Sequence, residues 1–215
     1  MNPGDLDLAI DNWGWWLASR ASGVVALVLV TISVGLGLMM ASKLMRRPGF
    51  SRVLTALHEQ TALAGMLAIS VHAVTLLGDP WLKPGVVGVL VPFTMDYRPL
   101  YSGLGVIAGI LALFLGLTFY ARKDVGSKFW RKIHRATILV YLLAVIHTIG
   151  AGTDASSPWM FWWLVTTTPA ITGLFVYRVF TAIRKGRGHL GVKSAKALKE
   201  EAGANSRAAA SPTSP

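Results

Sequence analysis

Long runs without a charged residue dominate the hydrophobic pattern of this 215-residue chain. A helix of about 20 predominantly apolar residues spans the hydrocarbon core of a bilayer, so each run predicts a transmembrane helix. The uncharged runs are 21–42, 60–78, 99–121, 136–153 and 155–177. With their flanking residues, the predicted helices cover 14–42, 52–77, 99–121, 129–150 and 157–183. The expected fold is an all-α polytopic bundle of five transmembrane helices.

Composition and charge agree with a membrane protein and predict its orientation. Hydrophobic residues make up 53% of the chain and charged residues only 14%, and the net charge is +11. The basic residues gather in two loops and the C-terminal tail, whereas loops 78–102 and 150–159 hold only Lys83 and Arg98. Because cytoplasmic loops carry the excess of Lys and Arg, we expect an external N-terminus and a cytoplasmic C-terminus. Topology explains the charge, so we predict a bilayer partner and no nucleic acid.

The ends of the chain differ from the apolar middle. Asp5, Asp7 and Asp11 stand where a cleaved signal peptide would have a basic start, so the first apolar segment is expected to be retained. The tail is basic over 186–201, which predicts a short amphipathic helix, and rich in small residues over 202–215, which predicts disorder. The expected regions are a short, loosely ordered external N-terminus at 1–12, a transmembrane domain at 13–183 and a cytoplasmic tail at 184–215.

A further segment, 80–98, lies between the second and third predicted helices. It contains three prolines and a short apolar run at 86–91. That run is too short to span a bilayer, which leaves a lid or a re-entrant segment open.

Four histidines lie at matched depths in two of the predicted helices. His58 and His72 are 14 positions apart, and His134 and His147 are 13 apart, which correspond to about 21 Å and about 20 Å along a helix. Both helices run from the cytoplasm outwards, so His58 pairs with His134 near the inner face and His72 with His147 near the outer face. Two axial imidazoles hold a haem iron without leaving an open position. We therefore predict two bis-histidine haems and transmembrane electron transfer.

The absence of cysteine limits the kind of haem, and the spacing of His134 and His147 predicts a distortion of the fourth helix. The chain has no cysteine, which excludes iron–sulfur clusters and covalent c-type haem. On an ideal helix, 13 residues leave His134 and His147 about 140° apart. A bulge, or a loosened first turn at His134, is expected to absorb that angle.

Two other functions stay open at this point. A haem-free transporter or metal-permeation protein would also place histidines in a membrane, but it would need acidic groups at depth, and the helices hold only Glu59 near the inner edge. A membrane anchor for a partner could use the basic tail. A single histidine near a helix end is ordinarily an interfacial residue, and His58 or His134 taken alone would be interpreted in this way. His72 and His147 lie deeper in the predicted spans, where an ionisable residue usually has a function.

Together these residues resemble the ferric reductase-like transmembrane domain family. That family includes NADPH oxidases, iron reductases and the haem subunit of the bacterial methionine sulfoxide reductase system. The resemblance covers roughly residues 13–180 and is closest to short bacterial members. It rests on the two histidine spacings and on the stretches Arg20-Ala21-Ser22-Gly23, Leu90-Val91-Pro92-Phe93, Tyr97-Arg98-Pro99-Leu100 and Gly150-Ala151-Gly152-Thr153-Asp154.

The resemblance implies particular ligands and one anion-binding side chain. It assigns the inner iron of two b-type haems to His58 and His134, and the outer iron to His72 and His147. It also suggests that Arg20 binds a propionate of the outer haem, although an arginine that reaches the lipid headgroups is an equal alternative. Arg98 is a second outer candidate. No catalytic residue is expected.

The resemblance also bears on partners. Larger relatives continue into flavin- and nicotinamide-binding domains, which we do not find here, so the expected donor is a cytoplasmic flavin reductase or a quinol. The external acceptor is open between a ferric chelate, oxygen, a quinone and a redox protein. Gly103-x-Gly105-x-x-Ala108 mimics a dinucleotide fingerprint inside a predicted helix, where it indicates helix packing. We expect a membrane component of an oxidoreductase, multi-pass in the cell membrane, with the bacterial inner membrane favoured.

Overall fold

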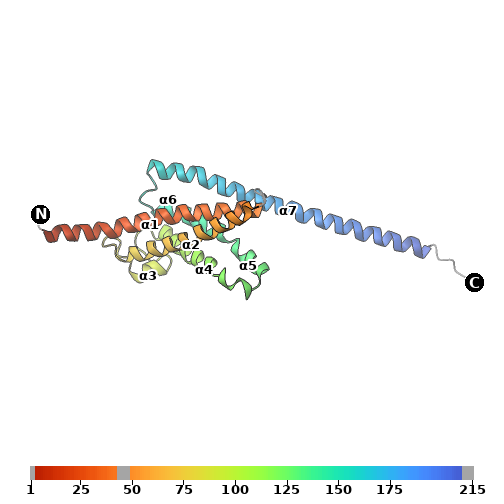
Figure 1. The fold of residues 1–215 in the computed structure, drawn as a ribbon, viewed down its shortest axis with the longest axis horizontal. Coiled ribbons are helices and arrows are strands. Elements are labelled where there is room, and N and C mark those ends of the chain that lie inside the picture. Colours follow the sequence, from red (N-terminus) through yellow and green to blue (C-terminus); the bar gives the residue numbers. More distant parts are fainter. Residues whose placement is uncertain (1–2, 43–48, 210–215) are drawn as a thin grey trace, which may run out of the picture. The chain divides into compact units, whose positions relative to one another are not determined.

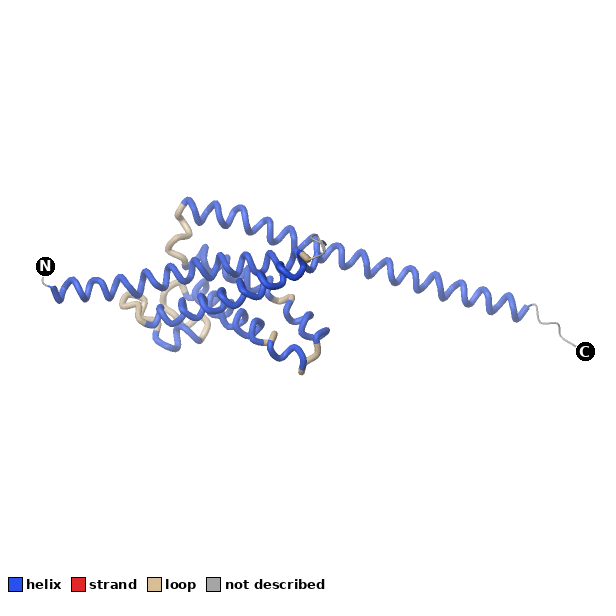
Figure 2. The backbone as a smooth tube through the Cα atoms, viewed as in Figure 1, coloured by secondary structure: helices blue, strands red, loops and turns tan. Residues whose placement is uncertain are grey.

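The computed structural model describes residues 3–42 and 49–209, with side chains described within 13–42 and 49–184. Figure 1 and Figure 2 show helices joined by loops and no strand in these ranges. Five described helical segments are long and apolar enough to cross a membrane, which confirms the predicted fold class. The orientation of the termini stays a prediction. The elements are α1 (Pro3–Ser42), α2 (Phe50–Leu77), α3 (Gly85–Leu90), α4 (Pro99–Leu117), the 3₁₀ helix η1 (Tyr120–Lys123), α5 (Ser127–His134), α6 (Thr137–Ala151) and α7 (Pro158–Ala209).

Four helices form the bundle that positions the histidines. α1 packs along α2, and α4 packs along α6 (Figure 1). Contacts of α1 with α6 and of α2 with α4 join the two pairs. The chain divides into two compact units, of which residues 1–174 hold this bundle and residues 175–215 hold the rest of α7.

Large apolar side chains of the spans face outwards, and several polar side chains are buried. Leu67, Phe114 and Ile149 lie within spans, yet 66%, 59% and 56% of their surfaces are exposed, whereas Thr31 and Ser102 are buried. Lipid tails solvate such exposed apolar groups as well as a protein core would, so this arrangement suits a bilayer. The main apolar cluster lies between α1, α6 and the start of α7, and it contains Leu27, Val34, Tyr141, Val145, Met160, Leu164 and Ile171.

The fourth predicted helix is divided into two. α5 ends at His134, α6 begins at Thr137, and Arg135 and Ala136 form a turn between them. An interruption is therefore present as expected, but it follows His134, which is itself the last residue of a regular helix. α4 likewise ends earlier than predicted, at Leu117, and η1 follows it.

Both ends of the described chain are more helical than the sequence predicted. α1 begins at Pro3, so the loosely ordered N-terminus expected at 1–12 is wrong for residues 3–12. Proline suits the first position of a helix, which Pro3 occupies. α7 reaches Ala209, so the disorder expected from 202 is wrong up to that residue, because alanine has the highest helix propensity. Residues 1–2 and 210–215 lie outside the described residues.

The segment between α2 and α4 folds back on the bundle. Its short helix α3 has six residues and packs on α2. One carboxylate oxygen of Asp79 accepts the N–H groups of Trp81 and Leu82, each at 2.9 Å, which fixes the turn after α2. Phe93 lies so close to Gly103 that a Cβ there would overlap its ring. Gly103 of α4 therefore packs against the turn that holds Phe93, whereas the sequence predicted packing against another helix.

Candidate functional site

The structure brings the four histidines together as two facing pairs. His58 and His72 lie on α2, His134 is the last residue of α5, and His147 lies on α6. The ring centres of His58 and His134 are 6.0 Å apart, with their planes at 88°. The ring centres of His72 and His147 are 6.5 Å apart, with their planes at 72°. These are the pairs that the parallel course of the two helices predicted.

The ring separations fit a metal ion held between two imidazoles. Each bond from an imidazole nitrogen to a first-row metal is about 2 Å, so two such nitrogens lie about 4 Å apart and the ring centres about 6 Å apart. Both pairs meet this spacing. Within the described residues, no group of three or more His, Cys, Asp or Glu side chains could hold a metal. The donor set is thus two imidazoles at each site, which suits haem iron better than a metal bound by protein alone.

Three of the imidazoles are fixed by a hydrogen bond from Nδ1 to a helix carbonyl. Nδ1 of His72 donates to the carbonyl of Ser19 at 2.7 Å, and Nδ1 of His58 donates to that of Ser33 at 2.9 Å. Nδ1 of His147 donates to the carbonyl of Tyr101, also at 2.9 Å. A carbonyl only accepts, so each Nδ1 carries the proton and each Nε2 keeps its lone pair for a metal.

A glycine four residues after each accepting carbonyl makes these contacts possible. A Cβ on Gly23 would stand 3.0 Å from Nδ1 of His72, and one on Gly37 would stand 3.3 Å from Cε1 of His58. A Cβ on Gly105 would overlap the ring of His147. The three histidines therefore rest directly against the backbones of α1 and α4. We did not identify these glycines as site residues from the sequence, although Gly23 and Gly37 show the same 14-residue spacing as His58 and His72.

His134 is held differently from the other three. Its Nδ1 is buried and has no hydrogen-bond partner among the described residues. Its ring stacks instead on Trp130, one helical turn earlier on α5, with ring centres 4.8 Å apart and planes at 25°. The indole N–H of Trp130 is also buried without a partner.

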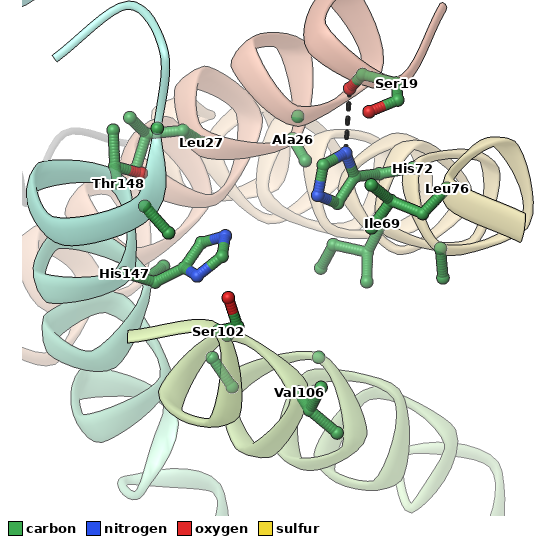
Figure 3. A pocket seen from close by; sticks show the side chains of 18 of the residues that line it. Ser19, Ala26, Leu27, Ile69, His72, Leu76, Ser102, Val106, His147 and Thr148 are labelled. Carbon is green, nitrogen blue, oxygen red and sulfur yellow. Dashed lines mark hydrogen bonds between the residues drawn. The ribbon is translucent and has the colours of Figure 1, made fainter. Parts of the chain in front are cut away.

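The pair formed by His72 and His147 faces a cavity of about 310 Å³. Figure 3 shows the two imidazoles on opposite sides of it, with the carbonyl of Ser19 beyond His72. Residues of α1, α2, α4 and α6 line the cavity, and most of them are apolar. Such a wall excludes water and suits the macrocycle of a haem.

Arg20 lines the same cavity but has a protein partner that the sequence did not reveal. Its Nε donates to a carboxylate oxygen of Asp154 at 2.6 Å, and its Nη2 donates to the other oxygen. Asp154 is buried, so the pair ties α1 to the turn before α7. No local pattern in the sequence shows which cation Asp154 meets.

Arg98 is not among the residues that line this cavity. Its guanidinium donates to the carbonyl of Gly150 near the end of α6, and its backbone is left-handed, with φ of 44°. Asp79 does line the cavity; it is buried, and its second carboxylate oxygen has no partner among the described residues. No local pattern in the sequence marks Asp79 as a residue of this cavity.

Fold and site together define a multi-pass helical membrane protein with two facing histidine pairs. The chain belongs to the family described as the ferric reductase like transmembrane component, whose model matches residues 22–145, more than half of the 215 residues. Membership identifies a membrane-embedded redox domain and suggests transmembrane electron transfer. The matched range includes His58, His72 and His134, whereas Arg20 and His147 lie outside it. Comparisons with curated proteins and with solved structures gave no match.

Proposed function

We propose that the protein passes electrons across the membrane through two b-type haems. His58 and His134 would be the axial ligands at the inner site, and His72 and His147 those at the outer site. The observation that carries the proposal is the facing of two imidazole pairs, with ring centres 6.0 Å and 6.5 Å apart. When bound, haem would supply reversible one-electron chemistry at each pair.

The chain's own residues would select that chemistry over others. Carbonyls of Ser19, Ser33 and Tyr101 hold three ligands in the tautomer that binds metal. Two imidazoles per iron leave no position for a substrate, which favours electron transfer over oxygen activation. A guanidinium has five N–H donors, so the donors of Arg20 that do not face Asp154 remain available for a propionate at the outer site.

The direction of electron flow follows from the predicted topology. We infer entry at the inner pair, from a cytoplasmic flavin reductase or a quinol, and exit at the outer pair to an external acceptor. Ferric chelates, oxygen, a quinone or a redox protein are the acceptor classes. We place the protein in the cell membrane, with the bacterial inner membrane favoured.

Purification with a haem assay tests the proposal. We expect a reduced-minus-oxidised b-type spectrum and about two haems per chain in a pyridine haemochrome assay. His72→Ala or His147→Ala should each lose one haem, and so should His58→Ala. His189→Ala is the matched control, because the fifth histidine lies outside the two spans that hold the other four. A chain that carries no haem, after expression with ample haem supply, would remove the proposal.

A further inference from the structure

We propose that His134 is an exchangeable ligand, so that the inner site binds a small neutral diatomic ligand such as carbon monoxide while the outer site does not. The inference rests on the proposed function, because it requires haem at both pairs. In the exchange, the bond from ferrous iron to Nε2 of His134 breaks and its electron pair stays on nitrogen. The carbon of carbon monoxide then donates an electron pair to the same iron, and no electron is lost or gained.

The first argument is the missing hydrogen bond. Nδ1 of His58, His72 and His147 each donates to a backbone carbonyl, whereas Nδ1 of His134 is buried without a partner among the described residues. A hydrogen bond at Nδ1 orients a metal-bound imidazole and makes it a stronger donor. His134 lacks both effects. It is therefore expected to be the weakest of the four ligands.

The second argument is the helix that carries His134. None of the eight residues of α5 is buried as a whole, although single atoms such as Nδ1 of His134 are. The sequence of α5 is strongly amphipathic. α6, which carries His147, buries Val140, Tyr141, Val145 and Gly150. Segments with few buried contacts open locally at a lower free energy than packed ones. α5 can therefore move while α6 stays in place.

The third argument is the turn between the two helices. Arg135 and Ala136 keep helical dihedral angles, but the N–H of Ala136 donates to the carbonyl three residues back, at 2.8 Å, so the regular four-residue ladder is interrupted between α5 and α6. The ring of His134 stacks on Trp130, which belongs to the same short helix and would move with it. Outside α5, the described aromatic contact of His134 is with His58, its partner across the inner site. Besides the bond to iron, a displacement of α5 would break the aromatic contact of Trp130 with Phe119, whose ring centres are 5.9 Å apart, and that of His134 with His58.

Carbon monoxide binding to the dithionite-reduced, purified protein tests the inference. The haem content is measured first, since a chain without haem defeats the proposed function before ligand exchange is reached. With two haems present, we expect carbon monoxide to shift the absorption of about half of the haem. If neither haem or both haems bind carbon monoxide, the inference is wrong, although transmembrane electron transfer would survive.

A glycine variant identifies which site reacts. Gly105→Ala should displace His147, because a Cβ there would overlap its ring. If the reactive haem is the inner one, this variant raises the fraction that binds carbon monoxide from about half towards all. If the outer haem already reacts in the wild type, the fraction does not rise, which would overturn the assignment to His134. Gly65→Ala is the control, because its Cβ would make only ordinary contacts of 3.5 Å or more, and the fraction should stay at about half.

A second variant keeps the test independent of how well Gly105→Ala folds. His134→Gly removes the side chain proposed to exchange, and added imidazole should restore a six-coordinate spectrum to about half of the haem. Carbon monoxide should compete with that imidazole after reduction. If His134→Gly keeps a fully six-coordinate spectrum with two haems and no added imidazole, His134 is not a ligand and the inference fails.

Discussion

At the scale of residues, the site depends on what the histidines rest against. Each of the three imidazoles with a hydrogen bond at Nδ1 lies against a glycine, where the Cβ of any other residue would crowd or overlap the ring. The carbonyl that accepts from Nδ1 stands one turn before that glycine, so one helical turn provides both the space and the acceptor. The glycines of α1 and α4 therefore determine ligand orientation without touching the metal.

Gly23→Ala tests this dependence in the outer pair. Its Cβ would stand 3.0 Å from Nδ1 of His72, so the ring must shift and weaken its bond to Ser19. Overpacking of this kind costs about 1–3 kcal/mol of unfolding free energy, and we expect a lower haem content as well. Gly173→Ala is the control, because nothing lies within 4 Å of its Cβ, and it should be neutral or more stable by up to ~1 kcal/mol. Thermal unfolding measures the stability of each variant, and a pyridine haemochrome assay measures its haem per chain. Equal stability and equal haem content in the two variants would contradict the dependence of His72 on Gly23.

The pair of Arg20 and Asp154 makes a second prediction at this scale. Its two hydrogen bonds link α1 to the turn before α7, and Asp154 is buried. Arg20→Gln or Asp154→Asn alone leaves a charged group without its partner, so each should lower the melting temperature. The double variant should lose less than the sum of the single losses, because directly interacting residues are not additive. Additive losses in a double-mutant cycle would show that the contact contributes nothing to stability.

At the scale of elements, the division of the fourth predicted helix matters most. An unbroken helix would place His134 and His147 about 140° apart, whereas the turn at Arg135 and Ala136 lets both rings face the histidines of α2. α5 thereby becomes an independent element with no buried residue. The turn at Arg135 and Ala136 therefore explains both the orientation of the histidine rings and the expected mobility of α5.

Hydrogen exchange of the purified protein in detergent or lipid discs tests the independence of α5. Amides of residues 127–134 should exchange faster than those of residues 137–151, because α6 has four buried residues and α5 has none. Peptides from the N-terminal half of α2 provide a comparison within a long packed helix. Equal protection of α5 and α6 would contradict the expectation and would weaken the case for an exchangeable His134.

At the scale of the whole molecule, the bilayer takes the place of a large apolar core. Few large side chains are fully buried among the described residues, and large apolar groups of the spans face outwards. Such a surface is stable only in lipid, so the bundle is expected to depend on detergent or a membrane. The distribution of Lys and Arg then decides which end of the bundle faces the cytoplasm.

Cysteine labelling tests that orientation. The chain has no natural cysteine, so Ser156→Cys and Ser127→Cys each introduce a single thiol at an exposed position. A membrane-impermeant maleimide added to the outside should label Ser156→Cys, and Ser127→Cys only after the membrane is permeabilised. The two variants control for each other, and the reverse pattern would invert the proposed direction of electron flow.

The sequence by itself determined the class of protein and the pairing of its histidines. Uncharged runs of sufficient length allow only spanning helices, because lipid offers no partner to an unpaired backbone group. The alternating direction of successive spans then makes α2 parallel to the segment that holds α5 and α6. Spacings of 14 and 13 residues place the two histidine pairs at matched depths, because a helix has a fixed rise per residue. These features are local or periodic, so they can be read without the fold.

Only the tertiary structure decided what surrounds each histidine. The carbonyls of Ser19, Ser33 and Tyr101 are acceptors because helices distant in sequence approach at glycines, and no local pattern records that approach. The partner of Arg20 lies 134 positions away, beyond the reach of any periodicity. The exact ends of α1 and α7 were also missed, since polar segments can be helical or irregular with small differences in free energy. The spacing of the histidines in the sequence thus determines their depth in the membrane, whereas tertiary packing determines the orientation of their rings and their hydrogen-bond partners.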